Sequence, residues 1–218
     1  EDREYRPPRQ WAYLREGSHL AWRAAAFELD RHVEPGQVLT VMGPSGIGKS
    51  TLLAYAAGFL APAFSPRGRV LVDGTPVTDL PAHARHMGLL FQDPLLFPHM
   101  SVQENIAYGL VNSGMDRDEI AERTLSGMDL VGLKGFEKRL PSELSGGQQQ
   151  RVAVARAIVL EPQVLLFDEP LSNLDAKLRR QVREEIRELQ IGLGLTVVYV
   201  THDQEEALAV SDKIVVMD

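Results

Sequence analysis

The sequence contains no cysteine. This absence excludes disulfide bonds, zinc sites built on thiolates and catalysis by a thiol, and it is compatible with a reducing compartment without proving one. No stretch has the roughly 20 apolar residues that cross a bilayer, because the longest mostly apolar segment spans residues 51–64 and contains Pro62. The N-terminal residues lack the apolar run of a signal peptide and an initiator methionine, so we expect a trimmed chain rather than a secreted one.

An excess of positive charge is also absent. The 218 residues carry a formal net charge of −7, so no overall positive field is available to hold a nucleic-acid backbone. Hydrophobic residues make up 44% of the chain, which is enough to bury one sizeable core. Composition therefore excludes a disordered tail, a collagen and a small disulfide scaffold.

Two kinds of segment alternate along the chain, and they predict an α/β fold. Short apolar runs typical of a parallel sheet covered on both faces are separated by helical patterns. Between about Asp93 and Pro162 the strand patterns disappear, which predicts an inserted all-helical part. Residues 69–72 followed by Asp73 and Gly74 predict a small antiparallel hairpin. The predicted strands span residues 38–42, 87–91, 164–167, 196–200 and 214–217, and helices are predicted over 49–60, 117–131, 146–160 and 176–189.

The segment from Gly43 to Ser50 fits the pattern Gly-x4-Gly-Lys-Ser between a predicted strand and a predicted helix. Glycines let successive backbone N–H groups face a polyphosphate, Lys49 neutralises its β and γ oxygens, and Ser50 can hold Mg²⁺. The alternative is a glycine-rich turn without a ligand. The residues predicted to bind phosphate are Gly43, Pro44, Ser45, Gly46, Ile47, Gly48, Lys49, Ser50 and Thr51.

Two adjacent carboxylates, Asp168 and Glu169, end a predicted strand. The carboxyl ends of parallel strands border the ligand crevice, so Asp168 is placed to reach Mg²⁺ and Glu169 to polarise a water molecule. Alone, such residues are more often solvated loop residues or helix caps. The upstream phosphate loop favours the functional interpretation.

Residues 144–148, Leu-Ser-Gly-Gly-Gln, precede another predicted helix. Ser145 and Gln148 fit a capping box that needs no ligand. The two adjacent glycines are unnecessary for a cap, but they expose N–H groups at a helix N-terminus, which indicates a possible second anion site.

Together, these three segments resemble the nucleotide-binding subunit of the ABC transporter family. Gln92 matches the family's Q-loop, residues 172–175 its D-loop, and His202 its switch histidine. The resemblance covers residues 38–218. It implies one ABC ATPase domain over 1–218 with a RecA-like P-loop NTPase core, a parallel-rich sheet, an inserted all-helical subdomain and a small antiparallel β part. The implied nucleotide-binding lobe comprises 1–92 and 162–218, and the helical subdomain comprises 93–161.

The resemblance also implies roles for single residues, with ATP and Mg²⁺ as cofactors. In the implied head-to-tail homodimer, ATP lies at the interface. Residues 144–148 of one subunit, the signature segment, close on the γ-phosphate held by Lys49 of the other. By similarity Glu169 is the general base, His202 senses the γ-phosphate, and Gln92 reports on metal and water. The implied catalytic residues are Glu169, His202, Gln92 and Lys49, and the implied metal ligands are Ser50, Gln92 and Asp168. The remaining implied nucleotide contacts are Ser145, Gly146, Gly147, Gln148 and Asp175. Asp175 is also implied to communicate across the dimer.

The family also stacks an aromatic residue on adenine, upstream of the phosphate loop. Residues 1–35 do not show that pattern clearly, and Trp22 is the candidate, with Tyr13 and His19 behind it. Ordinary packing is the competing interpretation of Trp22.

The predicted function is a Mg-ATP hydrolase that powers a membrane importer, resembling subunits for inorganic ions, iron or small organic solutes. Its implied partners are transmembrane permease subunits and, indirectly, a solute-binding protein, with no nucleic acid. The implied location is the cytoplasmic face of the inner membrane. The alternative is a cytosolic ABC-type ATPase acting as a DNA-associated clamp or an assembly scaffold, but residues 51–143 lack the sustained heptads of the DNA-associated type. Leu95, Leu96 and Phe97 either dock a transmembrane partner or pack the helical lobe.

Overall fold

The computed structural model describes residues 10–11, 25–26, 33–62, 64 and 66–217. A five-stranded sheet lies at its centre in the order β6-β7-β8-β3-β9, and every neighbouring pair is parallel. The strands are β3 (Val38–Met42), β6 (Met87–Leu90), β7 (Val164–Asp168), β8 (Thr196–Thr201) and β9 (Lys213–Val216). This arrangement confirms the predicted parallel-rich α/β fold.

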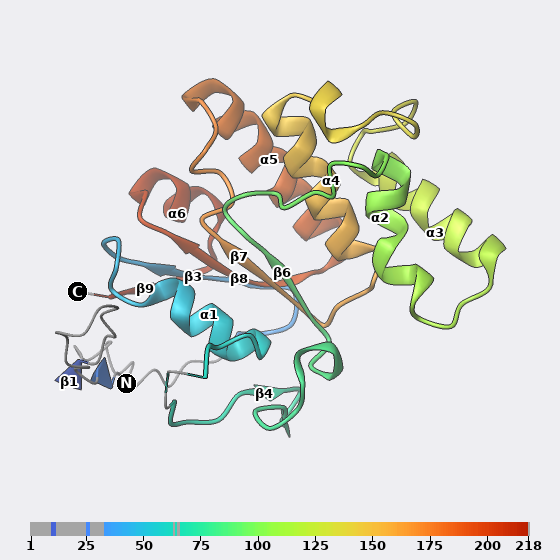
Figure 1. The fold of residues 1–218 in the computed structure, drawn as a ribbon. Helices are drawn as coiled ribbons and strands as arrows, with labels where there is room; N and C mark the ends of the chain where they lie inside the picture. Colours follow the sequence, from blue (N-terminus) through green and yellow to red (C-terminus); the bar gives the residue numbers. More distant parts are fainter. Residues whose placement is uncertain (1–9, 12–24, 27–32, 63, 65, 218) are drawn as a thin grey trace, which may run out of the picture.

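Both faces of the sheet are covered by helices (Figure 1). Because successive strand side chains point to opposite faces, neighbours along a strand join different cores. Leu165 and Phe167 pack in a core shared with α4 (Gly146–Ile158) and α5 (Ala176–Leu193), whereas Leu166 packs on the other face against α1 (Lys49–Ala57). Burial on both sides explains the continuous apolar runs of the strand sequences.

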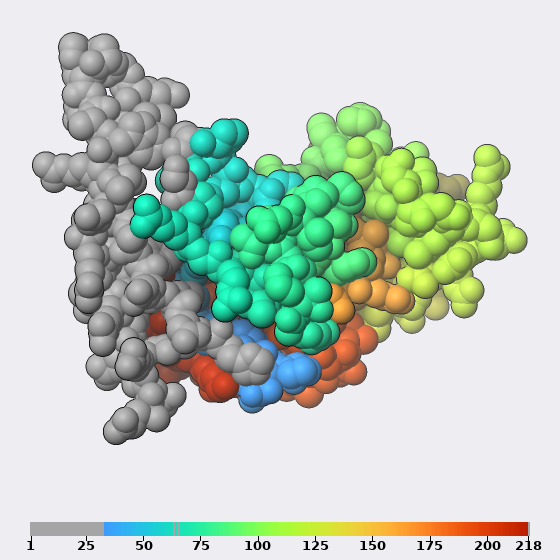
Figure 2. Space-filling view, turned by 90° about the horizontal axis from the view of Figure 1, so that it is seen from below, coloured from blue at the N-terminus to red at the C-terminus, as the bar shows by residue number. Residues whose placement is uncertain are grey.

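Three helices form the insertion between β6 and β7: α2 (Val102–Val111), α3 (Arg117–Leu130) and α4. Ser101 and Glu104 form a capping box at the start of α2, and Asp116 caps α3. Val102, Ile106 and Leu110 are fully buried in the core of this bundle. Figure 2 shows the helices α2 and α3 extending beyond the part of the molecule formed by residues 60–95.

The connection from β6 to β7 determines the direction of α4. The chain leaves β6 at its carboxyl end and returns to β7 at its amino end, where the N–H of Gln163 donates to the carbonyl of His86 (2.9 Å). α4 contacts β6 and is the last helix before this return. The N-terminus of α4 is therefore directed toward the edge of the sheet where the parallel strands end.

Several element boundaries differ from the sequence prediction. The first helix ends at Ala57 instead of residue 60, because Gly58 adopts a left-handed conformation and caps it. The hairpin strands are short, β4 (Leu71–Val72) and β5 (Thr75–Pro76), and they are joined by Asp73 and Gly74, both with positive φ. α5 continues to Leu193, and the seven-residue helix α6 (Gln204–Val210) was not predicted.

A second short antiparallel pair, β1 (Gln10–Trp11) and β2 (Ala25–Ala26), lies in the N-terminal part. Two short 3₁₀ helices, η1 (Ala82–Ala84) and η2 (Pro141–Glu143), complete the described elements. Within the described residues, no helix combines the length and the apolar character needed to span a bilayer.

Candidate functional site

The phosphate-loop segment joins the end of β3 to α1. Gly46 and Gly48 have φ angles of 83° and 111°, which other residues rarely adopt. A Cβ atom on Gly43 would lie 2.5 Å from the carbonyl oxygen of Met217, so the loop passes too close to the end of β9 for a side chain. The buried Lys49 ammonium donates to the carbonyls of Gly43 (2.9 Å) and Pro44 (3.0 Å). The loop therefore curls around this lysine.

Ser50 and Asp168 lie together, although 118 positions separate them in sequence. The Ser50 hydroxyl donates to Oδ1 of Asp168 over 2.8 Å. Burial raises the pKa of Asp168, and the nearby charge of Glu169 adds to this effect, while the Ser50 hydrogen bond and Lys49 oppose it. A hydroxyl and a carboxylate are hard oxygen donors, and Mg²⁺ is commonly held by one or two such protein groups together with phosphates and water. These residues fit the predicted metal.

Glu169 lies between two nitrogen-bearing side chains. Its Oε1 is 3.3 Å from Nζ of Lys49, and its Oε2 is 2.7 Å from Nδ1 of His202. The backbone of Glu169 is left-handed, with φ at 45°, which is strained for a residue with a side chain. Its N–H donates to the carbonyl of Val200 (3.0 Å). The predicted base, switch histidine and phosphate-loop lysine thus form one cluster.

The predicted metal role of Gln92 requires it to lie beside Ser50 and Asp168, but the structure places it beside another residue. Its Nε2 donates to Oδ1 of Asn173 (3.2 Å), and Nδ2 of Asn173 donates to Asp93 (2.6 Å). Among the described residues, no hydrogen bond joins Gln92 to Ser50 or Asp168. The structure therefore connects Gln92 to the loop that follows Glu169.

The signature segment satisfies the capping interpretation. The N–H of Gln148 donates to the Ser145 hydroxyl (3.4 Å), and Oε1 of Gln148 accepts from the Ser145 N–H (2.9 Å). A Cβ atom on Gly147 would lie 2.8 Å from Cδ1 of Leu178, so Gly147 also has a packing role where α4 meets α5. Ser145 and Gly146 are nevertheless exposed, which leaves the start of α4 accessible.

Two further predicted site residues are Asp175 and Trp22. Asp175 caps α5 by accepting hydrogen bonds from the N–H groups of Lys177 and Leu178, both 3.1 Å long. The adenine candidate Trp22, with Tyr13 and His19, lies outside the described residues. Sequence reasoning included Asn173 only as part of the D-loop, and it did not single out Arg179, whose guanidinium contacts that loop. An arginine near the N-terminus of a helix opposes the helix dipole, and that signal could have identified Arg179.

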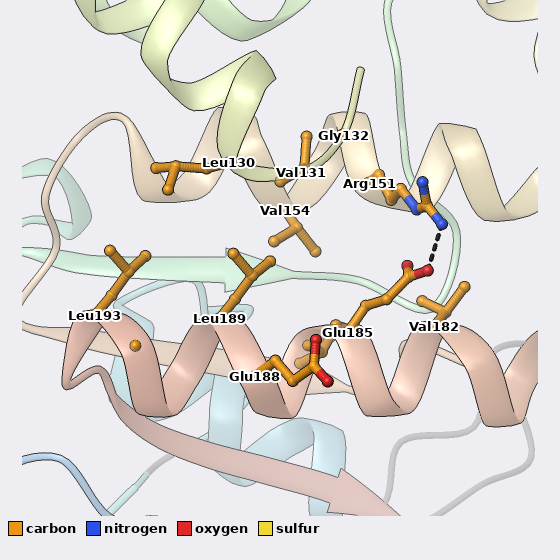
Figure 3. Close-up of a pocket in the computed structure, with 12 residues that line it drawn as sticks. Leu130, Val131, Gly132, Arg151, Val154, Val182, Glu185, Glu188, Leu189 and Leu193 are labelled. Atoms are coloured by element: carbon orange, nitrogen blue, oxygen red, sulfur yellow. Dashed lines mark hydrogen bonds and ion pairs between the residues drawn. The ribbon is translucent and has the colours of Figure 1, made fainter. Parts of the chain in front are cut away.

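A groove of about 440 Å³ lies away from this cluster, with α5 on one side and α4 and the end of α3 on the other (Figure 3). Leu130, Val154 and Leu189 contribute apolar walls, and an ion pair between Arg151 and Glu185 lies at one end. None of the predicted nucleotide or metal residues lines this groove. The phosphate-loop cluster and the groove are therefore separate features.

Comparison with known proteins gives one consistent family. A family model described as ABC transporter matches residues 27–172. The chain is 62% identical over 190 residues to the Fe(3+) ions import ATP-binding protein FbpC 1 of Rhizobium meliloti (strain 1021), covering 87% of this chain and 53% of that protein. It is 52% identical over 189 residues to FbpC of Pasteurella multocida (strain Pm70), again covering 87% and 53%. The chain thus spans about half the length of the curated relatives it matches.

A solved structure agrees with this comparison. The structure of cbiO1 from Clostridium perfringens, described as part of the ABC transporter complex cbiONQ, superimposes with a TM-score of 0.77 at 31% identity. The match covers 95% of this chain and 82% of cbiO1. The fold is therefore shared with this protein.

Proposed function

Because the chain belongs to the ABC transporter family, we propose that it binds and hydrolyses ATP to power a membrane importer. The observation that carries this proposal is the cluster of Lys49, Glu169 and His202, beside the Ser50–Asp168 pair, at the carboxyl ends of the parallel strands. Phosphoryl transfer depends mainly on positioning and charge stabilisation, which are what these groups supply.

Each group has a distinct task in this proposal. Lys49 and the backbone N–H groups of the loop hold the β- and γ-phosphates of ATP. Ser50 and Asp168 would hold Mg²⁺, and when bound, Mg²⁺ neutralises charge on the phosphate oxygens. Glu169 accepts a proton from the attacking water, and His202 orients the Glu169 carboxylate through the 2.7 Å contact with Nδ1.

The solute that we propose is ferric iron. The support comes from the relatives, which are Fe(3+) import ATP-binding proteins at 52–63% identity. The proposed partners are transmembrane permease subunits, with a solute-binding protein acting indirectly, and the proposed location is the cytoplasmic face of the inner membrane. The alternative of a DNA-associated clamp or a scaffold gains no support from these relatives or from the net charge of −7.

The proposal includes an ATP-linked homodimer. We expect the chain to be largely monomeric alone and to dimerise with ATP when hydrolysis is blocked, because each ATP is shared between Lys49 of one chain and the exposed Ser145 of the other. Sedimentation of the Glu169→Gln variant with and without Mg-ATP measures this. Ser145→Arg in the same background is the control, and it should stay monomeric. An unchanged mass on adding ATP would contradict the shared-nucleotide dimer.

We also propose that the loop after Gln92 docks the permease. Leu95 is 56% exposed, whereas Leu96 packs against the core and the Phe97 ring lies 4.4 Å from that of Tyr108, so Leu95 is the residue of the three that is open to a partner. Arg156 of α4 donates to the carbonyls of Pro94 and Leu95, both at 3.0 Å, which fixes this loop. The exposed Leu95 is thus presented on a rigid support, as an apolar contact requires.

The absence of cysteine makes this docking testable. In a Leu95→Cys variant the only thiol lies on the proposed surface, and we expect assembly with the permease to slow its maleimide labelling at least several-fold. Leu208→Cys, at a similarly exposed position on α6 (66%), should label at the same rate with or without the permease. Equal labelling rates at Leu95 in both states would remove this loop from the interface.

A further inference from the structure

One arginine connects the two segments that hold the proposed base. Arg179 lies in the first turns of α5, and its guanidinium extends back to the loop before that helix. Nε donates to the carbonyl of Leu171 (3.1 Å), and Nη2 donates to the carbonyls of Ser172 (3.3 Å) and Leu174 (3.0 Å). Nη1 lies 3.5 Å from Oδ2 of Asp203. The guanidinium therefore joins the loop after β7 to the segment after β8.

The loop after β7 fixes the backbone of Glu169. The carbonyl of Glu169 accepts from the Ser172 N–H (3.2 Å) and from the Ser172 hydroxyl (3.0 Å). Glu169 has a φ of 45°, a conformation that persists only where the surrounding structure imposes it. Arg179 donates to the carbonyl of Ser172 itself, so it restrains the residue that maintains the strained turn.

The segment after β8 fixes the side chain of Glu169. His202, which contacts Oε2 of Glu169, is half exposed, so packing alone does not set its position. Its neighbour Asp203 donates its N–H to the Thr201 hydroxyl (3.0 Å) and accepts the N–H of Glu206 at the start of α6 (3.1 Å). Arg179 contacts the carboxylate of the same Asp203 and thereby braces the backbone that carries His202.

We propose that Arg179 is a positioning residue that keeps Glu169 and His202 in register for water activation. This inference rests on the ATP hydrolysis proposed above. Arginine suits the task because its planar guanidinium offers five N–H donors in a fixed geometry, enough for three carbonyls and one carboxylate. A lysine ammonium has three donors at one point and cannot reach all four acceptors.

The first test compares Arg179→Gln and Arg179→Lys with the control Arg180→Gln, which changes the exposed neighbouring arginine. We expect Arg179→Gln to lower kcat about ten- to a hundred-fold, since small displacements of a catalytic group have effects of this size. The KM for ATP should stay within about threefold, because the phosphate loop is untouched. Arg179→Lys should recover only part of kcat, and Arg180→Gln should match the parent. A kcat of Arg179→Gln within twofold of the parent overturns the proposal.

The second test asks whether Arg179 acts through the Glu169–His202 pair. In a His202→Ala background, Arg179→Gln should have at most a few-fold effect, because groups that act as a unit are not additive. An equal fold-loss in both backgrounds would mean an independent role and would overturn the proposal.

A further variant guards against misfolding. If Arg179→Gln fails to fold, Asp203→Asn removes only the contact of Arg179 with the His202 segment and keeps a side chain that can cap α6. It should lower kcat several-fold at unchanged KM, and an unchanged kcat contradicts the inference. A parent chain without ATP hydrolysis would overturn the proposed function and this inference together, whereas an active parent with an equally active Arg179→Gln overturns the inference alone.

Discussion

Replacing Glu169 with glutamine is expected to lower the rate of ATP hydrolysis by about 10²–10⁴-fold, the usual contribution of a general base. An amide cannot accept the proton of the attacking water, but it has the size of the carboxylate and can still contact Lys49 and His202. ATP binding should therefore remain within a few-fold of the parent. The expected signature of this variant is binding without turnover.

Single-turnover hydrolysis and equilibrium ATP binding, measured on the same preparation, separate these two effects. Glu184→Gln is a matched control, since this exposed glutamate on α5 lies outside the cluster and the variant should keep the parental rate. A Glu169→Gln chain that hydrolyses ATP within a few-fold of the parent would exclude Glu169 as the base, whatever the family resemblance implies.

Replacing Lys49 with alanine is expected to weaken binding as well as turnover. The Lys49 ammonium is nearly inaccessible, with 4% of the residue exposed, and it is bound by two loop carbonyls and the Glu169 carboxylate. Its removal takes away the charge that we propose holds phosphate before and during transfer. A hydrogen bond to a charged group contributes about 1.5–3 kcal/mol. Since about 1.4 kcal/mol is tenfold in affinity, we expect the Kd for ATP to rise at least tenfold.

Calorimetric titration with ATP measures this loss directly. Lys177→Ala, which removes an exposed lysine at the start of α5, should bind ATP like the parent and controls for the change in net charge. Tight ATP binding by Lys49→Ala would show that the loop holds phosphate through its N–H groups alone. Together, the Lys49 and Glu169 variants separate the phosphate-binding charge from the base.

The sequence predicted those parts of the fold in which a local structural requirement selects one type of residue. Buried strands on two-sided sheets need continuous apolar residues, so the run ending at Phe167 was identifiable, and the loop around Lys49 needs glycines at fixed spacing. The seven-residue α6 was missed because two turns are too short to show a helical period. Contacts such as that of Gln92 with Asn173, 81 positions away, leave no local pattern.

Part of the candidate site could likewise be predicted from the sequence, and part could not. Ser50 and Asp168 were predicted to share a metal because parallel strands end at one edge, and their hydroxyl and carboxylate do lie within hydrogen-bond distance. The left-handed backbone of Glu169 could not be predicted, because no glycine or asparagine marks it. The proposed bracing of Glu169 by Arg179 uses three backbone carbonyls as acceptors, and because every residue carries a carbonyl, no residue type marks them in the sequence.

The direction of α4 gives the molecule a lever arm. Near its C-terminal end this helix is fastened by Arg156 to the loop that contains Leu95, while its N-terminal residue follows the exposed Ser145. From Ser145 to Arg156 the helix rises 1.5 Å per residue, which makes an arm of roughly 17 Å. A tilt of about 10° at the fastened end therefore moves Ser145 by about 3 Å, on this helix geometry. That displacement is as long as a hydrogen bond, so a small movement of the loop at Leu95 would be sufficient to make or break the proposed contact between Ser145 and a phosphate.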